Sequence, residues 1–159
     1  MSRVLFIALL IPLSALAKPW NGIVPGDSGA LDVVGKFGEP SKRLKSRGLE
    51  VLVYTRETAI KGTVQAQFKV DAQTQVVERI DVYPEPILDA AAIEKSYGGE
   101  CAPKAPKEPC YYRKEAEAKD GGAGGKRPYF LYLKLGLAIF FKDDGKTVQS
   151  FAFLPEPKE

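Results

Sequence analysis

The sequence predicts an α+β fold made of two tandem repeats, each a helix followed by an antiparallel meander. Two stretches carry this prediction: residues 64–86 align with residues 135–157 without a gap. Each begins with alternating apolar residues, which is typical of a strand with one buried face. A polar turn follows, and a second strand then ends at Pro-Glu-Pro, because proline lacks the N–H that a sheet ladder needs. The same hairpin is therefore predicted twice.

A short helix is predicted before each meander. Asp27 or Ser28 can cap the first helix, and Phe37-Gly38 suits its C-terminal end. Asp89 can cap the second helix, whose Tyr97-Gly98 repeats the ending of the first. The helices therefore support the repeat independently of the hairpins.

The remaining segments complete a three-stranded meander in the first repeat and a longer one in the second. Residues 49–54 read as a strand, whereas the basic run 42–47 reads as a solvated loop. In the second repeat, residues 111–113 begin the meander. The glycine-rich stretch 119–127 forms a long hairpin tip, which accounts for the wider spacing between helix and final hairpin in this repeat. We expect the two repeats to share one curved sheet with the helices on one face.

Residues 1–17 have the features of a secretory signal peptide. A positive Arg3 precedes an apolar run, and Ala15-Leu16-Ala17 is a small-x-small cleavage sequence. The run is too short for a stable membrane span. We therefore expect cleavage after Ala17, a secreted or periplasmic protein without a transmembrane segment, and two repeats at 18–86 and 87–159.

The charge balance identifies no nucleic-acid or membrane partner. The chain carries 23 Lys and Arg against 20 Asp and Glu, a net charge of +3, and these are spread without a long basic block. The expected partner is a protein.

Cys101 and Cys110 are the two cysteines of the chain. An even count in an exported protein favours a disulfide, which would close the proline-rich loop between them. The alternative is a redox-active pair, which usually has the C-x-x-C spacing that is absent here.

The usual catalytic and metal-binding sets are not evident in the sequence. The chain has no histidine, which removes Ser-His and Cys-His catalysis and histidine metal ligands. Asp143-Asp144-Gly145 reads as a turn rather than a calcium loop, and residues 120–127 lack the Ser or Thr of a phosphate-binding loop. We expect no cofactor, no metal site and no enzymatic activity.

An aromatic sheet face is the candidate binding site. If residues 129–141 form one long strand, Phe130, Tyr132 and Phe140 face away from the core. With Tyr111 or Tyr112 they would form a partner-binding patch, since exposed aromatic side chains often mark contact surfaces. The alternative is that the apolar lead-in around Trp20, or the neighbouring repeat, covers these rings.

The segment Gly26–Pro40, with Asp32-Val33 followed by Phe37-Gly38-Glu39-Pro40 and later Tyr54, resembles the small outer-membrane lipoprotein family that includes BamE (SmpA/OmlA). The lipid-attachment cysteine of that family is missing. The doubled arrangement resembles the fold of the β-lactamase inhibitory protein. This resemblance implies a non-catalytic role in protein binding or in the cell envelope.

The sequence therefore leaves three functional classes. The first is a secreted or periplasmic protein-binding module, for example an inhibitor of an extracellular enzyme. The second is a structural accessory of the bacterial envelope, and an enzyme is the third and least favoured class.

Overall fold

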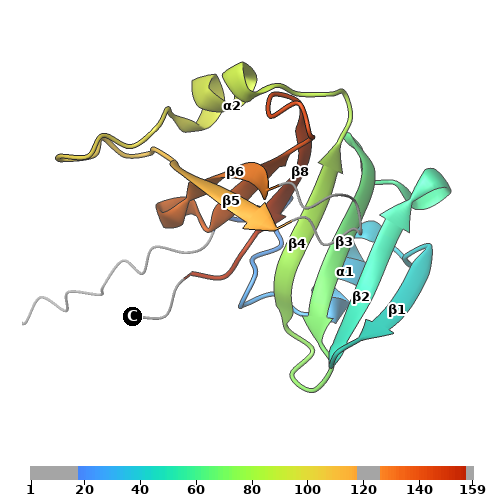
Figure 1. Ribbon diagram of the computed structural model, residues 1–159. Coiled ribbons are helices and arrows are strands. Elements are labelled where there is room, and N and C mark those ends of the chain that lie inside the picture. Colours follow the sequence, from blue (N-terminus) through green and yellow to red (C-terminus); the bar gives the residue numbers. More distant parts are fainter. Residues whose placement is uncertain (1–17, 118–125, 157–159) are drawn as a thin grey trace, which may run out of the picture.

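The computed structural model describes residues 18–117 and 126–156. The predicted signal peptide and most of the predicted hairpin tip lie outside the described residues. The described chain is an α+β protein with one eight-stranded antiparallel sheet and two short α-helices (Figure 1). The predicted α+β class and the single sheet are therefore confirmed.

The first half of the chain contributes one helix and four strands to this architecture. In chain order its elements are α1 (Ala30–Phe37), β1 (Lys42–Ser46), β2 (Leu49–Thr55), the 3-10 turn η1 (Arg56–Thr58), β3 (Thr63–Asp71) and β4 (Val77–Pro84).

The second half has the same kinds of elements in the same order. They are α2 (Ala90–Tyr97), β5 (Tyr112–Glu117), β6 (Lys126–Tyr132), the 3-10 turn η2 (Leu133–Leu135), β7 (Leu137–Phe141) and β8 (Val148–Phe153). The strand order in the sheet is β1-β2-β3-β4-β8-β7-β6-β5. Each set of four strands thus runs outward from the centre, where β4 pairs with β8 (Figure 1).

The two predicted hairpins are present as β3–β4 and β7–β8, and their pairing registers match. Phe68 lies opposite Ile80 in the first, and Ile139 lies opposite Phe151 in the second, which are the positions that the sequence alignment equates. Both ladders also shift register at the matching place, after Lys69 and after Phe140. The common alternation places the apolar residues of both hairpins in the core.

Both helices are held at their C-terminal ends by a tyrosine hydroxyl. Tyr54 on β2 donates to the carbonyl of Gly38 at 2.8 Å, and Tyr132 on β6 donates to the carbonyl of Gly98 at 2.7 Å. Each bond satisfies a carbonyl that the helix itself leaves without a partner. The two halves therefore fasten helix to sheet with the same contact.

The N-terminal caps differ between the helices. Asp89 accepts the Ala92 N–H at 2.8 Å, as predicted. The predicted cap at Asp27 or Ser28 is wrong, because α1 begins after Gly29. There the Asp32 carboxylate accepts the Gly29 N–H at 2.7 Å.

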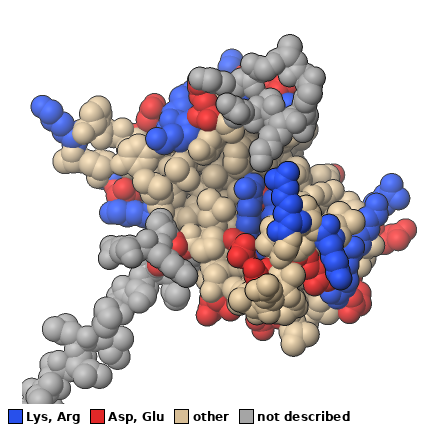
Figure 2. All heavy atoms as spheres, turned by 60° about the horizontal axis from the view of Figure 1, so that its bottom comes forward, with Lys and Arg blue, Asp and Glu red and all other residues tan. Residues whose placement is uncertain are grey.

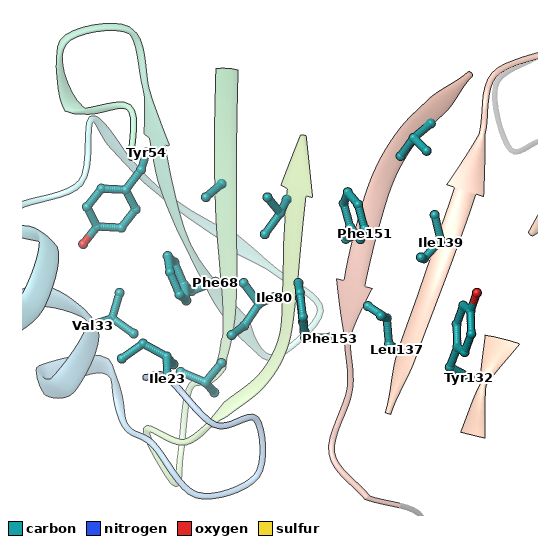
Figure 3. Close-up of a cluster of buried hydrophobic side chains, with 14 of the residues drawn as sticks. Ile23, Val33, Tyr54, Phe68, Ile80, Tyr132, Leu137, Ile139, Phe151 and Phe153 are labelled. Carbon is teal, nitrogen blue, oxygen red and sulfur yellow. The ribbon is translucent and has the colours of Figure 1, made fainter. Parts of the chain in front are cut away.

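A single apolar cluster extends across the sheet from β2 to β6 (Figure 3). Phe68 and Ile80 lie at one side of its centre, and Leu137 and Ile139 at the other. Val33 from α1 and Ile93 from α2 are both buried in it. The cluster joins the two halves because the inward residues of β4 and β8 lie side by side, as Ile80 and Phe153 do.

Two expectations about the strands are wrong. The basic run is not a loop: it forms the edge strand β1, whose residues are all exposed and which pairs with β2. Lysine and arginine on an edge strand discourage pairing with other chains. The first half therefore has four strands rather than three.

The expected long strand at 129–141 is interrupted in its middle. The 3-10 turn η2 and Gly136, at φ 56°, separate β6 from β7. A side chain at Gly136 would come within 2.6 Å of the Leu154 carbonyl oxygen, so only glycine fits this close approach. The interruption reverses the chain and changes which residues face the core.

Candidate functional site

The candidate site lies on the second face of the sheet, which is the face opposite the apolar cluster. Cross-strand pairing defines it, because directly opposed residues share a face. Tyr112 opposes Leu131, Leu131 opposes Ala138, and Ala138 opposes Ala152. Ala152 in turn opposes Asp81 on β4, so the second face continues across both halves.

Three of the predicted binding residues do not lie on this face. Phe130, Tyr132 and Tyr111 are only 2%, 1% and 2% exposed and belong to the apolar cluster. The prediction that Phe130 and Tyr132 face outward is wrong. They lie on the core face because η2 and Gly136 shift the alternation between β6 and β7.

The buried rings have a structural role in the second half. Tyr111 stacks on Phe130 with their centroids 3.7 Å apart, and its hydroxyl donates to Glu94 of α2 at 2.7 Å. Burial, together with this bond to a carboxylate, raises the pKa of Tyr111 to about 12. Burial also raises the pKa of Tyr132. These phenols stay neutral at physiological pH and act as hydrogen-bond donors.

Phe140 and Tyr112 do lie on the second face. Phe140 is half-buried, and Tyr112 is 38% exposed. Phe140 opposes Tyr129 of β6, and the two rings stack with their centroids 5.0 Å apart. The role of Phe140 and Tyr112 in binding stays a prediction. Tyr129 also lies on the second face, although the expected long strand would place it in the core.

An ion network lies beside the aromatic pair. Asp81 is 4% exposed. One carboxylate oxygen of Asp81 lies 2.7 Å from Lys69 Nζ. The other lies 2.7 Å from Arg79 Nε and 2.7 Å from a terminal nitrogen of the same guanidinium. The guanidinium of Arg79 also lies 5.9 Å from the centroid of the Phe140 ring, within the range of a cation–π contact. The carboxylate thus fixes the position of Arg79.

The sequence analysis did not predict this network, although the alternation of residues in β4 indicates part of it. Arg79, Asp81 and Tyr83 alternate with the apolar residues of β4 and so had to share the other face. Which cation would meet Asp81 depends on the pairing of β3 with β4, where Lys69 opposes Arg79.

The comparisons with known proteins leave the chain without an assigned family. No family model matches it, and searches of curated proteins and of solved structures give no significant match. The resemblance to the BamE family and to the β-lactamase inhibitory protein therefore remains a prediction. Among the described residues, no helix is both long and apolar enough to span a membrane.

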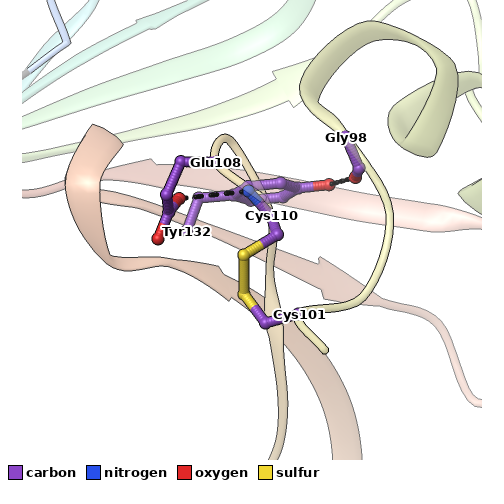
Figure 4. The surroundings of a disulfide bond; sticks show 5 residues. All are labelled: Gly98, Cys101, Glu108, Cys110 and Tyr132. Carbon is purple, nitrogen blue, oxygen red and sulfur yellow. Dashed lines mark hydrogen bonds between the residues drawn. A yellow bond between two sulfur atoms is a disulfide. The ribbon is translucent and has the colours of Figure 1, made fainter. Parts of the chain in front are cut away.

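The predicted disulfide between Cys101 and Cys110 is present (Figure 4). It closes an exposed loop whose ends are anchored by backbone bonds of Tyr111 to Gly99 and Cys101. A carboxylate oxygen of Glu108 and the two sulfurs all lie within 4.8 Å of one another. Because the sulfurs are bonded to each other, they cannot serve as thiolate metal ligands.

Two other surface features carry little specificity. A hollow of about 620 Å³ beside α1 is lined by charged, polar and small residues and by Ile23 and Leu31, of which Leu31 is 87% exposed. Figure 2 turns the bottom of Figure 1 toward the reader. On this side, basic and acidic side chains are mixed and surround an area of uncharged residues. The second face is more distinctive because it combines a stacked aromatic pair with a fixed cation.

Proposed function

We propose that this chain is an exported, non-catalytic protein-binding module that binds its partner with the second face of the sheet. The stacked pair of Tyr129 and Phe140, with Arg79 held over it, is the observation that carries the proposal. Aromatic and arginine side chains dominate binding hot spots, and they contribute most when their conformation is fixed before binding.

The architecture supports a binding scaffold. The proposal includes a tandem duplication, supported by the shared hairpin register and by the two tyrosine contacts to helix ends. It also includes the helices covering one face of the sheet, supported by the burial of Val33 and Ile93 in the same cluster. The helices would cover that face, and the half-buried rings of Tyr129 and Phe140 lie on the other, where a partner would bind.

Export is the expected route to the site of action. The signal-peptide pattern with cleavage after Ala17 supports it, and the disulfide between Cys101 and Cys110 is typical of oxidising compartments. An inhibitor of an extracellular enzyme would fit this location, as would a structural accessory of the bacterial envelope.

The binding role is tested by immobilising the mature protein and incubating it with the envelope fraction of its own source. We expect a partner whose capture is lost with Phe140→Ala and with Tyr129→Ala. The matched control is Leu31→Ala, an exposed apolar residue of α1, which should leave capture unchanged. Equal capture by all variants would contradict binding through the second face.

Fractionation separates the two forms of the proposal. A freely soluble pool favours a secreted or periplasmic binder. Stable co-purification with outer-membrane material favours the envelope accessory.

A further inference from the structure

We propose that the partner of the second face is an acidic protein surface, recognised by cations on both sides of the aromatic pair. This inference rests on the proposed function and names the chemistry of the partner. Its basis is the distribution of charge that the strand register imposes on the second face.

Two cations and one carboxylate lie on the β4 side of the aromatic pair. Lys69 and Arg79 both contact Asp81, so the three side chains together leave one positive charge. Lys69 and Arg79 remain 29% and 36% exposed, whereas the carboxylate is 6% exposed. An approaching partner therefore meets the cations rather than the carboxylate.

A third cation lies on the other side of the pair. Lys114 on β5 opposes Tyr129, which in turn opposes Phe140, so all three share the second face. Lys114 is exposed. The aromatic pair is thus flanked by Lys114 on one side and by Arg79 and Lys69 on the other.

This arrangement fits a partner segment with an apolar or aromatic anchor between carboxylates. The stacked rings offer contact area, while the flanking cations offer complementary charge, which fixes register and speeds association. The buried carboxylate of Asp81 keeps Arg79 in place, so little side-chain freedom is lost on binding. An acidic surface is favoured over a basic one, which would bring like charges together.

The test is a titration of the isotope-labelled mature protein with a random copolymer of glutamate and tyrosine, followed by NMR. We expect saturable binding with the largest amide shifts at Tyr112, Ala138, Phe140 and Ala152. Lys114→Glu should weaken the binding about fivefold, on the scale of exposed ion pairs. The matched control Lys107→Glu changes an exposed loop lysine by the same charge and should have little effect.

Arg79→Gln and Lys69→Gln should also weaken binding, with thermal unfolding measured in parallel because each removes a partner of Asp81. Lys114→Glu keeps the test decisive if either variant fails to fold. Shifts spread over the helices, or equal weakening by Lys107→Glu, would overturn the proposal. So would equally tight binding of single-stranded DNA at the same residues, which would indicate a general anion surface. These outcomes leave the envelope capture experiment unaffected, so the two proposals fail separately.

Discussion

At the scale of single residues, neighbouring aromatic side chains have different roles. Phe130 on β6 packs in the apolar cluster between Tyr111 and Phe141, whereas Phe140 on β7 lies on the second face against Tyr129. Two phenylalanines on paired strands thus serve the core and the candidate site separately.

We expect Phe130→Ala to lower the free energy of unfolding by about 3–5 kcal/mol, as for other buried phenylalanines. Phe140→Ala should lower it by less, about 1–2.5 kcal/mol, because it loses a stacked pair and the burial of only part of the ring. Urea unfolding of both variants measures the difference. Equal losses would place Phe140 in the core and remove it from the binding face.

The buried phenol of Tyr111 makes stability sensitive to alkaline pH. Its raised pKa, about 12, exceeds the value of roughly 10 for an unfolded tyrosine. The folded chain therefore keeps a proton that the unfolded chain loses. The stabilisation from this group is fully present below about pH 10 and is lost as the pH rises toward about 12.

Tyr111→Phe should therefore reduce the loss of stability between about pH 9 and pH 11. The variant cannot ionise at this position, although it also loses the bond to Glu94. Urea unfolding at both pH values gives the comparison with the wild-type protein. An unchanged pH dependence would mean that other groups, such as Tyr132, control the alkaline range.

At the scale of secondary-structure elements, the two helix ends offer a matched pair of glycines. Gly38 and Gly98 end α1 and α2 at φ 77° and 98°, a region that other residues rarely adopt. A side chain at Gly38 would meet nothing within 4 Å. At Gly98 it would come within 1.9 Å of the Pro109 carbonyl oxygen.

We expect Gly38→Ala to cost about 1–3 kcal/mol through backbone strain alone. Gly98→Ala should cost more, because the disulfide loop must also move away from the end of α2. Chemical unfolding measures both costs. A smaller cost at Gly98 than at Gly38 would show that the loop yields without loss of packing.

At the scale of the whole molecule, the two halves are joined by more than the sheet. The β4–β8 ladder pairs Ile80, Asp81 and Val82 with Phe153, Ala152 and Phe151. Trp20 adds contacts to both halves. Its ring centroid lies 5.8 Å from that of Phe68 on β3 and 6.4 Å from that of Phe153 on β8. Lys18 extends the link, because its backbone N–H donates to Leu135 and its ammonium lies 4.0 Å from the Tyr97 ring centroid.

Trp20→Ala should lower the free energy of unfolding by about 3 kcal/mol, at the low end for a large aromatic residue because Trp20 is only partly buried. Trp20→Phe should restore most of this loss by keeping an aromatic ring between the halves. Trp20 is the single tryptophan, so both variants lose the tryptophan fluorescence signal. Urea unfolding is therefore followed by circular dichroism. A negligible effect of Trp20→Ala would show that the lead-in does not bind the halves together.

Local patterns in the sequence were enough to predict the fold class, the hairpins and the disulfide. Alternation of period two identifies strands without knowledge of their neighbours, and the Pro-Glu-Pro endings mark where they stop. Cys101 and Cys110 are close in the chain, so their pairing needs little tertiary information. The cap at Asp89 is equally local.

The sequence alone could not determine which aromatic residues face a partner. One 3-10 turn and Gly136 reverse the chain between β6 and β7, and a change of one residue in register transfers every following side chain to the other face. The contacts of Asp81 with Lys69 and Arg79 likewise depend on cross-strand pairing. Period-two alternation is a local property of the chain, whereas the face that a strand buries is set by the strands and helices packed around it.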